Sequence, residues 1–526
     1  MLRLTIDGVE VQVAEGTNLV EASKKAGIEI PTTCYHPGLR VVGQCRICFV
    51  EVESMPHLVT ACSTPAQNGM IVMTKSPRVR NARAAVLEFL LANHPLDCPV
   101  CDQAGECSLQ DFSMEIGLDE SRMIDEKRTF PGFESRQIGP AVVQNQNRCI
   151  RCSRCIRFTQ EIFETHDLIM KGRGARAYID TFDGRPFDNP WSACVADVCP
   201  VGALTVKDFR FRARVWHLME TPSICPGCSV GCNIDVGHLD GVVHRFKPRT
   251  NPEINGWWMC DHGRSLASDL NNRDLDRPAV RSGSTFSTLT WNEALVILAE
   301  TIVTKKPRIV ASANLSNEAL FLIRRLFVEH LDLEVVVPTD SGAQRWIKNE
   351  RGTRIESIEV QPNGTGARLI GLSMVDEKGL RDFVSQSSVI LLDNRAHAWL
   401  AGPDAAAELR GRLAAVFGRR HTELSRTADL IFPTASWFET EGSFTSSTGR
   451  VQLARPGWSP VRLGRPAWRT LTDLAVRLDL PLENCISPRR VFEEIVQEIP
   501  AFAGMTYRRL SSEPGIPILK DIPHVG

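Results

Sequence analysis

The chain has 526 residues, of which 43% are hydrophobic and 23% are charged, and its formal net charge is −1. This length allows several domains of ordinary size, and the nearly neutral charge gives no reason to expect a nucleic acid as a partner. No apolar run is long enough to span a bilayer, and no N-terminal signal is evident. We therefore expect a protein without a transmembrane segment, in the cytoplasm or peripheral on the cytoplasmic side of the inner (plasma) membrane.

The cysteines are unevenly distributed. Sixteen of the 17 lie between Cys34 and Cys260, and the remaining one is Cys485. Disulfides are rare in a reducing cytosol, where clustered cysteines more often bind metals. The sequence therefore predicts a front half rich in metal sites and a rear half without them.

The first elements are predicted to be a hairpin around Asp7-Gly8, a helix capped by Asn18, a cysteine loop, and strands at 49–53 and 70–74. This order resembles the β-grasp fold of plant-type ferredoxins, which hold a [2Fe–2S] cluster with four thiolates. A zinc ribbon would need two CxxC pairs, and only one is present. The first predicted ligand group, with spacing C-x10-C-x2-C-x13-C, is Cys34, Cys45, Cys48 and Cys62.

The second group follows an amphipathic helix predicted over residues 82–94, which Pro95 ends. Its members are His94, Cys98, Cys101 and Cys107. This spacing fits zinc and [4Fe–4S] equally. The neighbouring iron–sulfur motifs favour a cluster, because Zn²⁺ has no accessible redox state and would interrupt electron passage. An imidazole in place of a thiolate makes a cluster less negative and raises its potential, as in Rieske centres.

The third group shares its pattern with bacterial two-cluster ferredoxins, which carry C-x2-C-x2-C-x3-C-P twice and exchange the fourth cysteine between clusters. Here Thr159 replaces the fourth cysteine of the first run, and the second run retains only Cys199 before Pro200. One [4Fe–4S] cluster is therefore predicted to survive, on Cys149, Cys152, Cys155 and Cys199.

Other residues near the third group have open roles. Cys194 is one position out of register, and we predict a buried free thiol. The intervening arginines either raise the cluster potential or are solvated surface residues; they are Arg148, Arg151, Arg154 and Arg157.

The fourth group, with spacing C-x2-C-x3-C-x27-C, resembles the N-terminal cluster segment of molybdopterin oxidoreductases such as formate dehydrogenases. It comprises Cys225, Cys228, Cys232 and Cys260. A third [4Fe–4S] cluster is predicted there, with zinc as the alternative, because CxxC is a generic motif.

In the rear half, apolar strands at 308–313 and 387–393 and a helical pattern at 316–331 predict α/β layers. Residues 277–295 and 428–452 resemble the molybdopterin oxidoreductase fold, in a region shorter than that family's usual domain, so we expect no molybdopterin. "GTGARLIG" at 364–371 misses the dinucleotide fingerprint. We therefore expect neither NADH nor flavin on this chain.

Taken in order, the four groups resemble those of the large peripheral iron–sulfur subunit, the G subunit, of bacterial respiratory complex I, NADH:quinone oxidoreductase. The carrying stretches are "CYHPGL", "GQCRICFVEV", "HPLDCPVCDQAGECSLQD" and "CIRCSRCIRF". The resemblance implies [2Fe–2S] on the first group, [4Fe–4S] on the second and third, and an off-path [4Fe–4S] on the fourth.

The resemblance also implies an electron-transfer subunit of a proton-translocating enzyme. A flavin-bearing, NADH-oxidising partner subunit would supply electrons to the first group. These would then pass the Cys149 and His94 groups to a ferredoxin-like [4Fe–4S] subunit nearer the quinone. The membrane arm would be contacted only indirectly, and no side chain of this chain is expected to act as acid, base or nucleophile.

The expected fold class is multidomain, α+β in the front and α/β in the rear. The expected domains are a 2Fe-2S ferredoxin-type domain at 1–78, a 4Fe-4S segment ligated by one histidine and three cysteines at 79–118, a halved bacterial-ferredoxin-like domain at 119–217, a 4Fe-4S Mo/W bis-MGD-type segment at 218–274 and a reduced molybdopterin-oxidoreductase-like domain at 275–526.

Two other functions remain open. A subunit of an NAD-dependent formate dehydrogenase or hydrogenase complex shares much of the front half, but a molybdenum site needs a later cysteine, and Cys485 lies outside any matching motif. A zinc-stapled scaffold is the second alternative, and iron content with EPR spectra would distinguish it. The rear half is expected to be a structural or docking module.

Overall fold

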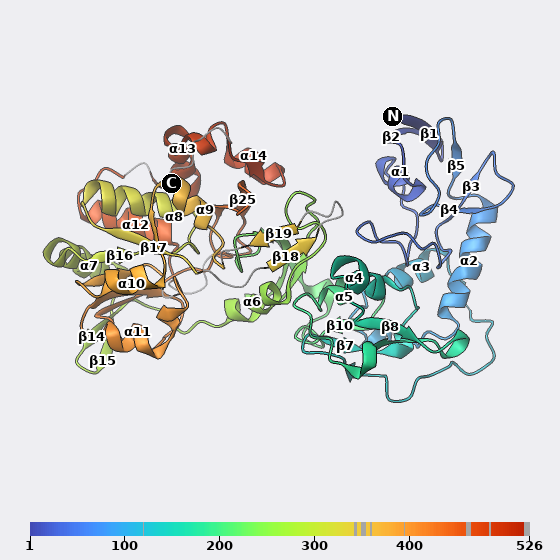
Figure 1. The fold of residues 1–526 in the computed structure, drawn as a ribbon, viewed down its shortest axis with the longest axis horizontal. Coiled ribbons are helices and arrows are strands. Elements are labelled where there is room, and N and C mark those ends of the chain that lie inside the picture. Colours follow the sequence, from blue (N-terminus) through green and yellow to red (C-terminus); the bar gives the residue numbers. More distant parts are fainter. Residues whose placement is uncertain are drawn as a thin grey trace. The chain divides into compact units, whose positions relative to one another are not determined.

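The computed structural model describes residues 1–118, 120–340, 345–348, 354–357, 360–393, 395–458, 464–482 and 485–519. The chain divides into two compact units, the first built from Met1–Leu218 with Lys348–Gly352 and the second from Met219–Ile347 with Thr353–Gly526 (Figure 1). Among the described residues, no helix is both long and apolar enough to cross a membrane. The predicted mixture of α+β and α/β structure is confirmed.

The first unit begins with a five-stranded β-grasp sheet. Asp7 and Gly8 adopt positive φ angles of 46° and 85°, so the predicted hairpin is confirmed as a tight two-residue turn. Helix α1 (Leu19–Lys25) begins where the Asn18 side chain accepts a hydrogen bond from the Glu21 N–H. The strands, in the order β2-β1-β5-β3-β4, are β1 (Leu2–Ile6), β2 (Val9–Val13), β3 (Phe49–Val52), β4 (Val59–Thr60) and β5 (Ile71–Met73).

Helix α2 (Pro77–Leu91) begins at Ser76, whose side chain accepts from the Val79 N–H, with Pro77 in the first turn. The predicted end of this helix was wrong, because the helix stops at Leu91, three residues before His94. The physical reason is that Pro95 disfavours the helical conformation of the residue before it. His94 therefore lies in the loop after the helix.

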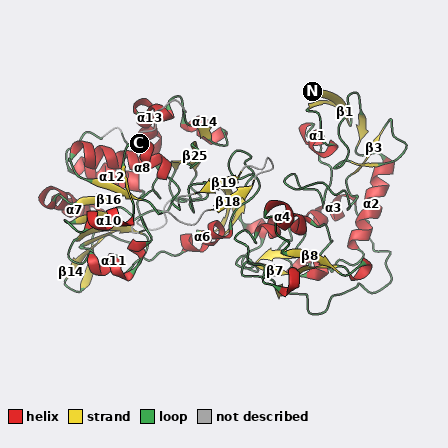
Figure 2. Cartoon of the chain, in the orientation of Figure 1, coloured by secondary structure: helices red, strands yellow, loops and turns green. Residues whose placement is uncertain are grey.

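The rest of the first unit consists of short elements separated by long loops (Figure 2). β10, β7 and β6 form one sheet, and β8 pairs with β9 in a hairpin. The elements are α3 (Ser108–Ile116), β6 (Arg136–Gln137), β7 (Val142–Gln144), α4 (Arg154–Ile162), β8 (Leu168–Lys171), β9 (Tyr178–Thr181), α5 (Cys194–Val198) and β10 (Leu204–Val206).

The second unit begins with an antiparallel three-stranded sheet and a helix. β11 (Met219–Ile224) pairs with β12 (Asn233–Leu239), which pairs with β13 (Val242–Pro248). Helix α6 (Asp261–Asn271) follows and begins at Cys260, whose sulfur accepts from the Gly263 N–H.

An eight-stranded sheet, in the order β15-β14-β23-β22-β21-β16-β17-β20, forms the centre of the second unit. β16 pairs in parallel with both β17 and β21, and β14 joins the edge antiparallel to β23. After β16 the chain adds β17 and β20 on one side of it, and then adds β21, β22 and β23 on the other side. The strands are β14 (Ala279–Ser282), β15 (Thr285–Thr288), β16 (Arg308–Val310), β17 (Val335–Pro338), β20 (Ser373–Val375), β21 (Val389–Leu391), β22 (Leu413–Gly418) and β23 (Leu430–Pro433).

Helices cover both faces of this sheet (Figure 1). Ile309 packs with α7, α8 and α12 on one face, whereas its neighbour Val310 packs with α10 and α11 on the other, as the two-residue period of a strand requires. The predicted strands and helix of the rear half are confirmed. The helices are α7 (Trp291–Lys305), α8 (Asn317–Ile323), α9 (Gly364–Ile370), α10 (Glu377–Val384), α11 (Pro403–Glu408), α12 (Ala467–Arg477), α13 (Pro488–Glu498) and α14 (Tyr507–Ser512).

Two small sheets complete the second unit. β18 (Arg345–Lys348) pairs with β19 (Arg354–Ser357), and β24 (Gly442–Thr445), β25 (Arg450–Ala454) and β26 (Ile516–Pro517) form the other. Buried Glu318 on α8 ties this second sheet to the helices, because its carboxylate accepts from the Ser443 N–H at 2.9 Å and from the Tyr507 hydroxyl at 2.7 Å. Gly366 on α9 allows close packing, since a Cβ there would lie 2.1 Å from Asn317 Oδ1.

Candidate metal centres

The β-grasp sheet gathers the first cysteine group. Cys48 directly precedes β3 and Cys62 follows β4, and the Ala61 N–H donates to the Cys48 carbonyl at 3.0 Å, so the hairpin register sets these two cysteines side by side. Cys34 and Cys45 come from the preceding loop, in which Arg46 adopts a positive φ of 63°.

The four thiols of this group act on one another. The Cys34 thiol donates to the Cys45 sulfur, which raises the pKa of Cys34 and lowers that of Cys45 to about 5. Hydrogen bonding between Cys48 and Cys62 likewise lowers the pKa of Cys48 and raises that of Cys62, on which Cys34 and Cys45 also act. The arrangement therefore favours the thiolate, the form that binds iron, at Cys45 and Cys48.

The second group comes together through its three cysteines. Cys98 lies in the single helical turn Cys98–Val100, and Cys107 precedes α3. Burial raises the pKa of Cys107, and the charges of Cys101 and Cys98 raise it further. The structure thus brings the three predicted thiols close enough to interact.

His94 is buried near charged residues. Burial lowers the pKa of His94 to about 4, with Arg148 acting in the same direction and Asp97 opposing it. Arg148 itself donates to Asp97 at 2.9 Å. The imidazole is therefore neutral at pH 7, which is the form a metal ligand needs, and ligation by His94 stays a prediction.

The third group surrounds a cavity in the first unit. Its four thiols line this cavity together with residues such as Gln146 and Ile179. Arg151 and Ser153 adopt positive φ angles of 56° and 60°, and these left-handed turns wind the cysteine loop around the cavity. Burial raises the pKa of Cys149, Cys152 and Cys199 to about 11 and raises that of Cys155 well above its ordinary value.

The arginines of this loop are placed between the first and third groups. Arg157 is 6% exposed and donates to the Cys34 carbonyl at 2.5 Å. Arg154 donates to the carbonyls of Tyr35 and Val198, and its charge acts on the thiols of Cys152, Cys199 and Cys34. Arg148 is also only 6% exposed, so the solvated-surface interpretation is wrong for at least Arg148 and Arg157.

The fourth group lies wholly in the second unit. Cys225 and Cys232 face each other across the β11–β12 turn, where the Cys225 N–H donates to the Cys232 carbonyl at 2.8 Å. Burial raises the pKa of Cys232 well above its ordinary value, and the charges of Cys225, Cys228 and Cys260 add to this. The structure thus brings all four predicted residues together.

The donor sets fit iron–sulfur clusters. In a [4Fe–4S] cluster each thiolate binds its own iron, so the thiols surround a volume, as those of the third group surround their cavity. Among the described residues, no three His, Cys, Asp or Glu side chains are grouped so that they could hold one metal ion.

Sequence reasoning missed one residue and was right about another. A Cβ on Gly202 would lie 2.1 Å from the Cys101 sulfur, so this glycine lets the Cys199 loop pass beside the second group. The sequence shows a glycine shortly after Cys199-Pro200, but only the fold shows that Gly202 lies against Cys101. Cys194 is fully buried, as predicted.

Known families match consecutive parts of the chain. Their descriptions are a 2Fe-2S iron-sulfur cluster binding domain at residues 1–77, an NADH-ubiquinone oxidoreductase-G iron-sulfur binding region at 83–122, an NADH-quinone oxidoreductase subunit 3 ferredoxin-like domain at 139–205, a molybdopterin oxidoreductase Fe4S4 domain at 218–272 and molybdopterin oxidoreductase at 362–477. These matches confirm the predicted fold class and the iron–sulfur nature of the front half.

The curated relatives are subunits of NADH-quinone or NADH-ubiquinone oxidoreductase. The NADH-quinone oxidoreductase G subunit of Rickettsia bellii is 40% identical over 327 residues, which cover 62% of this chain and 48% of that protein. The mitochondrial NADH-ubiquinone oxidoreductase 78 kDa subunit of Candida albicans is 40% identical over 332 residues, covering 62% of this chain and 46% of that protein. The corresponding Neurospora crassa subunit is 43% identical over 309 residues, covering 58% and 41%.

A solved structure of NAD⁺-reducing [NiFe]-hydrogenase in the H2-reduced state contains a chain that is 30% identical, with 41% of this chain and 91% of that chain covered and a TM-score of 0.37. The matched region makes up less than half the length of the three curated relatives named above. The consecutive iron–sulfur domains and the identities of the curated relatives show that the matched part of this chain is similar to the G subunit of NADH-quinone oxidoreductase.

Proposed function

We propose that the chain is an electron-transfer subunit of a proton-translocating NADH:quinone oxidoreductase. Its ligands are the first group for one [2Fe–2S] cluster, the second and third groups for two [4Fe–4S] clusters, and the fourth group for a further [4Fe–4S] cluster. When bound, these clusters accept and donate single electrons. The observation that carries the proposal is the convergence of the four third-group thiols on one cavity.

The protein's own residues position the ligands and set their electrostatic surroundings. Arg154 connects the loop of the first group to the end of α5 before Cys199, so the two groups share one positive charge. The Cys107 thiol lies 3.8 Å from the Pro200 carbonyl, which connects the second and third groups. Within the first unit, three groups are thus linked through direct contacts, which supports successive electron transfer.

The partners in this proposal are a flavin-bearing, NADH-oxidising subunit and a ferredoxin-like [4Fe–4S] subunit, with the complex peripheral on the cytoplasmic side of the inner membrane. The domain boundaries proposed from the sequence, at 78, 118, 217 and 274, place each ligand group in its own segment. The described lining of the second unit's cavity offers no cysteine as a molybdenum ligand. Cys485 lies in the helical core beside Glu494 instead.

Cysteine substitution in the anaerobically purified full chain tests the proposal. Cys155→Ser should remove iron and sulfide and one [4Fe–4S] EPR signal, because Cys155 lines the cavity of the third group. The matched control is Cys194→Ser, a change at a fully buried cysteine of the same unit that is outside the ligand group. Zinc in place of iron, or equal metal loss in both variants, would contradict the proposal.

His94→Cys tests the unusual ligand. A thiolate ligand carries a negative charge that the neutral imidazole lacks. The midpoint potential of this cluster should therefore fall while the cluster remains assembled. Redox titration followed by EPR measures the change. An unchanged titration would remove His94 from the ligands, while the cysteine assignments would still stand on the iron content.

A further inference from the structure

A cavity of about 300 Å³ in the second unit opens at one edge of the eight-stranded sheet. Its lining includes residues that directly follow parallel strands: Leu392 and Asp393 after β21, Arg419 after β22 and Thr434 after β23. The chain reverses its direction of building between β16 and β21. Ligands of open α/β sheets bind at this carboxyl edge, beside such a reversal point.

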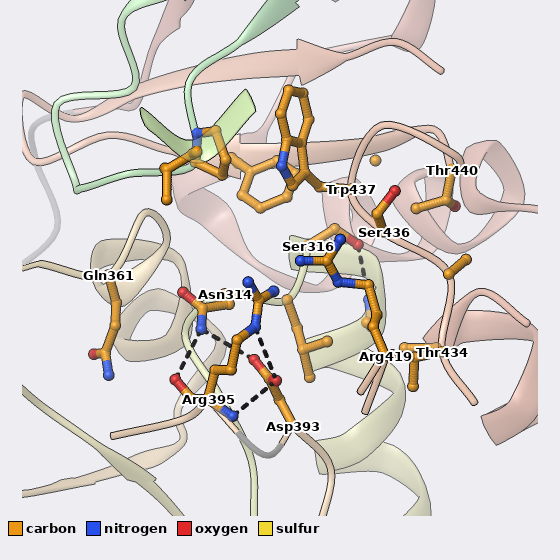
Figure 3. Close-up of a pocket in the computed structure, with 18 of the residues that line it drawn as sticks. Asn314, Ser316, Gln361, Asp393, Arg395, Arg419, Thr434, Ser436, Trp437 and Thr440 are labelled. Atoms are coloured by element: carbon orange, nitrogen blue, oxygen red, sulfur yellow. Dashed lines mark hydrogen bonds and ion pairs between the residues drawn. The ribbon is translucent and has the colours of Figure 1, made fainter. Parts of the chain in front are cut away.

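The cavity has an apolar wall and a polar floor. Trp437, Phe444 and Leu315 contribute apolar surface, and Ser436 and Thr440 contribute hydroxyl groups. Figure 3 shows Trp437 on one side of the cavity, with the side chains of Arg395 and Arg419 extending toward the same space. A volume of this size matches the lower end of small-molecule sites.

Arg419 has unused hydrogen-bonding capacity. The residue is 7% exposed, and its Nε and Nη1 atoms are buried without a hydrogen-bond partner. Its Nη2 donates to Asp269 at 2.7 Å. Burial, together with the charge of Arg395, lowers the pKa of Arg419 to about 10, so the guanidinium stays charged at pH 7. A buried charge with unpaired donors is destabilising unless an acceptor joins it.

The three carboxylates that line the cavity already have hydrogen-bond partners, and Asp340 accepts from the Ala398 N–H at 3.0 Å. Asp269 accepts from three guanidinium groups, those of Arg395, Arg419 and Arg420. Asp393 accepts from Ser312 Oγ and from Asn314 Nδ2, both at 3.0 Å. Asp269 is thus shared by three arginines and leaves the Nε and Nη1 donors of Arg419 without an acceptor.

From these contacts we infer that the cavity binds a small organic oxyanion, a phosphate monoester or a carboxylate, whose charged group pairs with Arg419 Nε and Nη1. The planar or apolar body of this ligand packs against Trp437 and Phe444. A guanidinium edge recognises two oxygens of such a group at once. The cavity adjoins the loop of the fourth group, since Pro226 and Gly227 line it, but the inference does not rest on the function proposed above.

Calorimetric titration of the full chain with phenyl phosphate and with benzoate tests the inference, in a buffer free of other oxyanions. Phenol serves as the uncharged ligand. We expect one site that binds one or both anions at least about tenfold more tightly than phenol. Preference for phenyl phosphate would identify a phosphate monoester site, and preference for benzoate a carboxylate site.

Three variants locate the site. Arg419→Gln should weaken binding at least about tenfold, whereas Arg420→Gln, which also removes an arginine from Asp269 but does not line the cavity, should not. Ala435→Phe fills the cavity and should abolish binding without touching the arginine. No binding to the wild-type chain, or binding that survives either Arg419→Gln or Ala435→Phe, would overturn the inference.

Discussion

Replacing Arg154 with methionine should lower the midpoint potentials of both the first-group and the third-group clusters. The Arg154 charge acts on Cys34 in one group and on Cys152 and Cys199 in the other. A further sign of the positive field is His36, whose pKa falls to about 3 through burial and the charges of Arg154 and Arg157. Because reduction adds negative charge, removing a cation makes reduction less favourable at both centres.

The magnitude follows from the arrangement. A unit charge roughly 8 Å from a cluster, at an effective dielectric constant of about 20, contributes about 2 kcal/mol. For one electron this corresponds to roughly 90 mV, and solvent screening would reduce it to about half. The variant also loses two hydrogen bonds to carbonyls, which should cost about 3 kcal/mol of unfolding free energy.

Redox titration with EPR detection measures both potentials in one sample. The matched control is Arg40→Met, which removes an arginine from the same loop as Cys34. Its side chain is 81% exposed and paired with Glu161, so its effect should be largely screened. A folded Arg154→Met protein whose potentials both match the wild type, or rise, would refute the reasoning.

Two further predictions concern packing and buried charge. Gly202→Ala should displace the Cys101 thiol and remove the second-group cluster signal while the [2Fe–2S] signal persists. Retention of both signals would contradict this prediction. The control is Gly402→Ala, whose added Cβ would meet only the Trp399 carbonyl oxygen, at 3.3 Å. Burial raises the pKa of Glu318 in the folded protein above its ordinary value of 4.5. The protonated side chain therefore contributes to the free energy of unfolding at low pH, and this contribution is lost as the pH rises through the folded pKa. Denaturant unfolding should therefore show that Glu318→Gln gains stability relative to wild type from about pH 5 to about pH 8. A difference in unfolding free energy that stays constant over this range would contradict the prediction.

Local sequence rules predicted the individual elements well. The Asp7-Gly8 turn, the Asn18 cap and the strand runs of the first sheet each depend on neighbouring residues, which a sequence displays directly. The end of α2 was wrong because the preference of a residue before proline opposed the continuing apolar pattern at His94.

The spacing of the cysteines predicted their division into four groups, because each chelate loop has its own characteristic length. Spacing says nothing about which groups share neighbours. Only the tertiary structure places Arg154 and Arg157 against the carbonyls of the first group and Gly202 against Cys101. These contacts join residues far apart in the chain, and no local pattern encodes them.

The rear half shows the same division. Its apolar strands and helices were readable from the sequence as α/β layers, since their periodicity is a property of each segment alone. The sequence did not predict the strand order, the cavity at the carboxyl edge of the sheet or the unpaired donors of Arg419. A cavity arises where loops after several separate strands converge, so its existence and its charge are decided by the packing of the whole sheet.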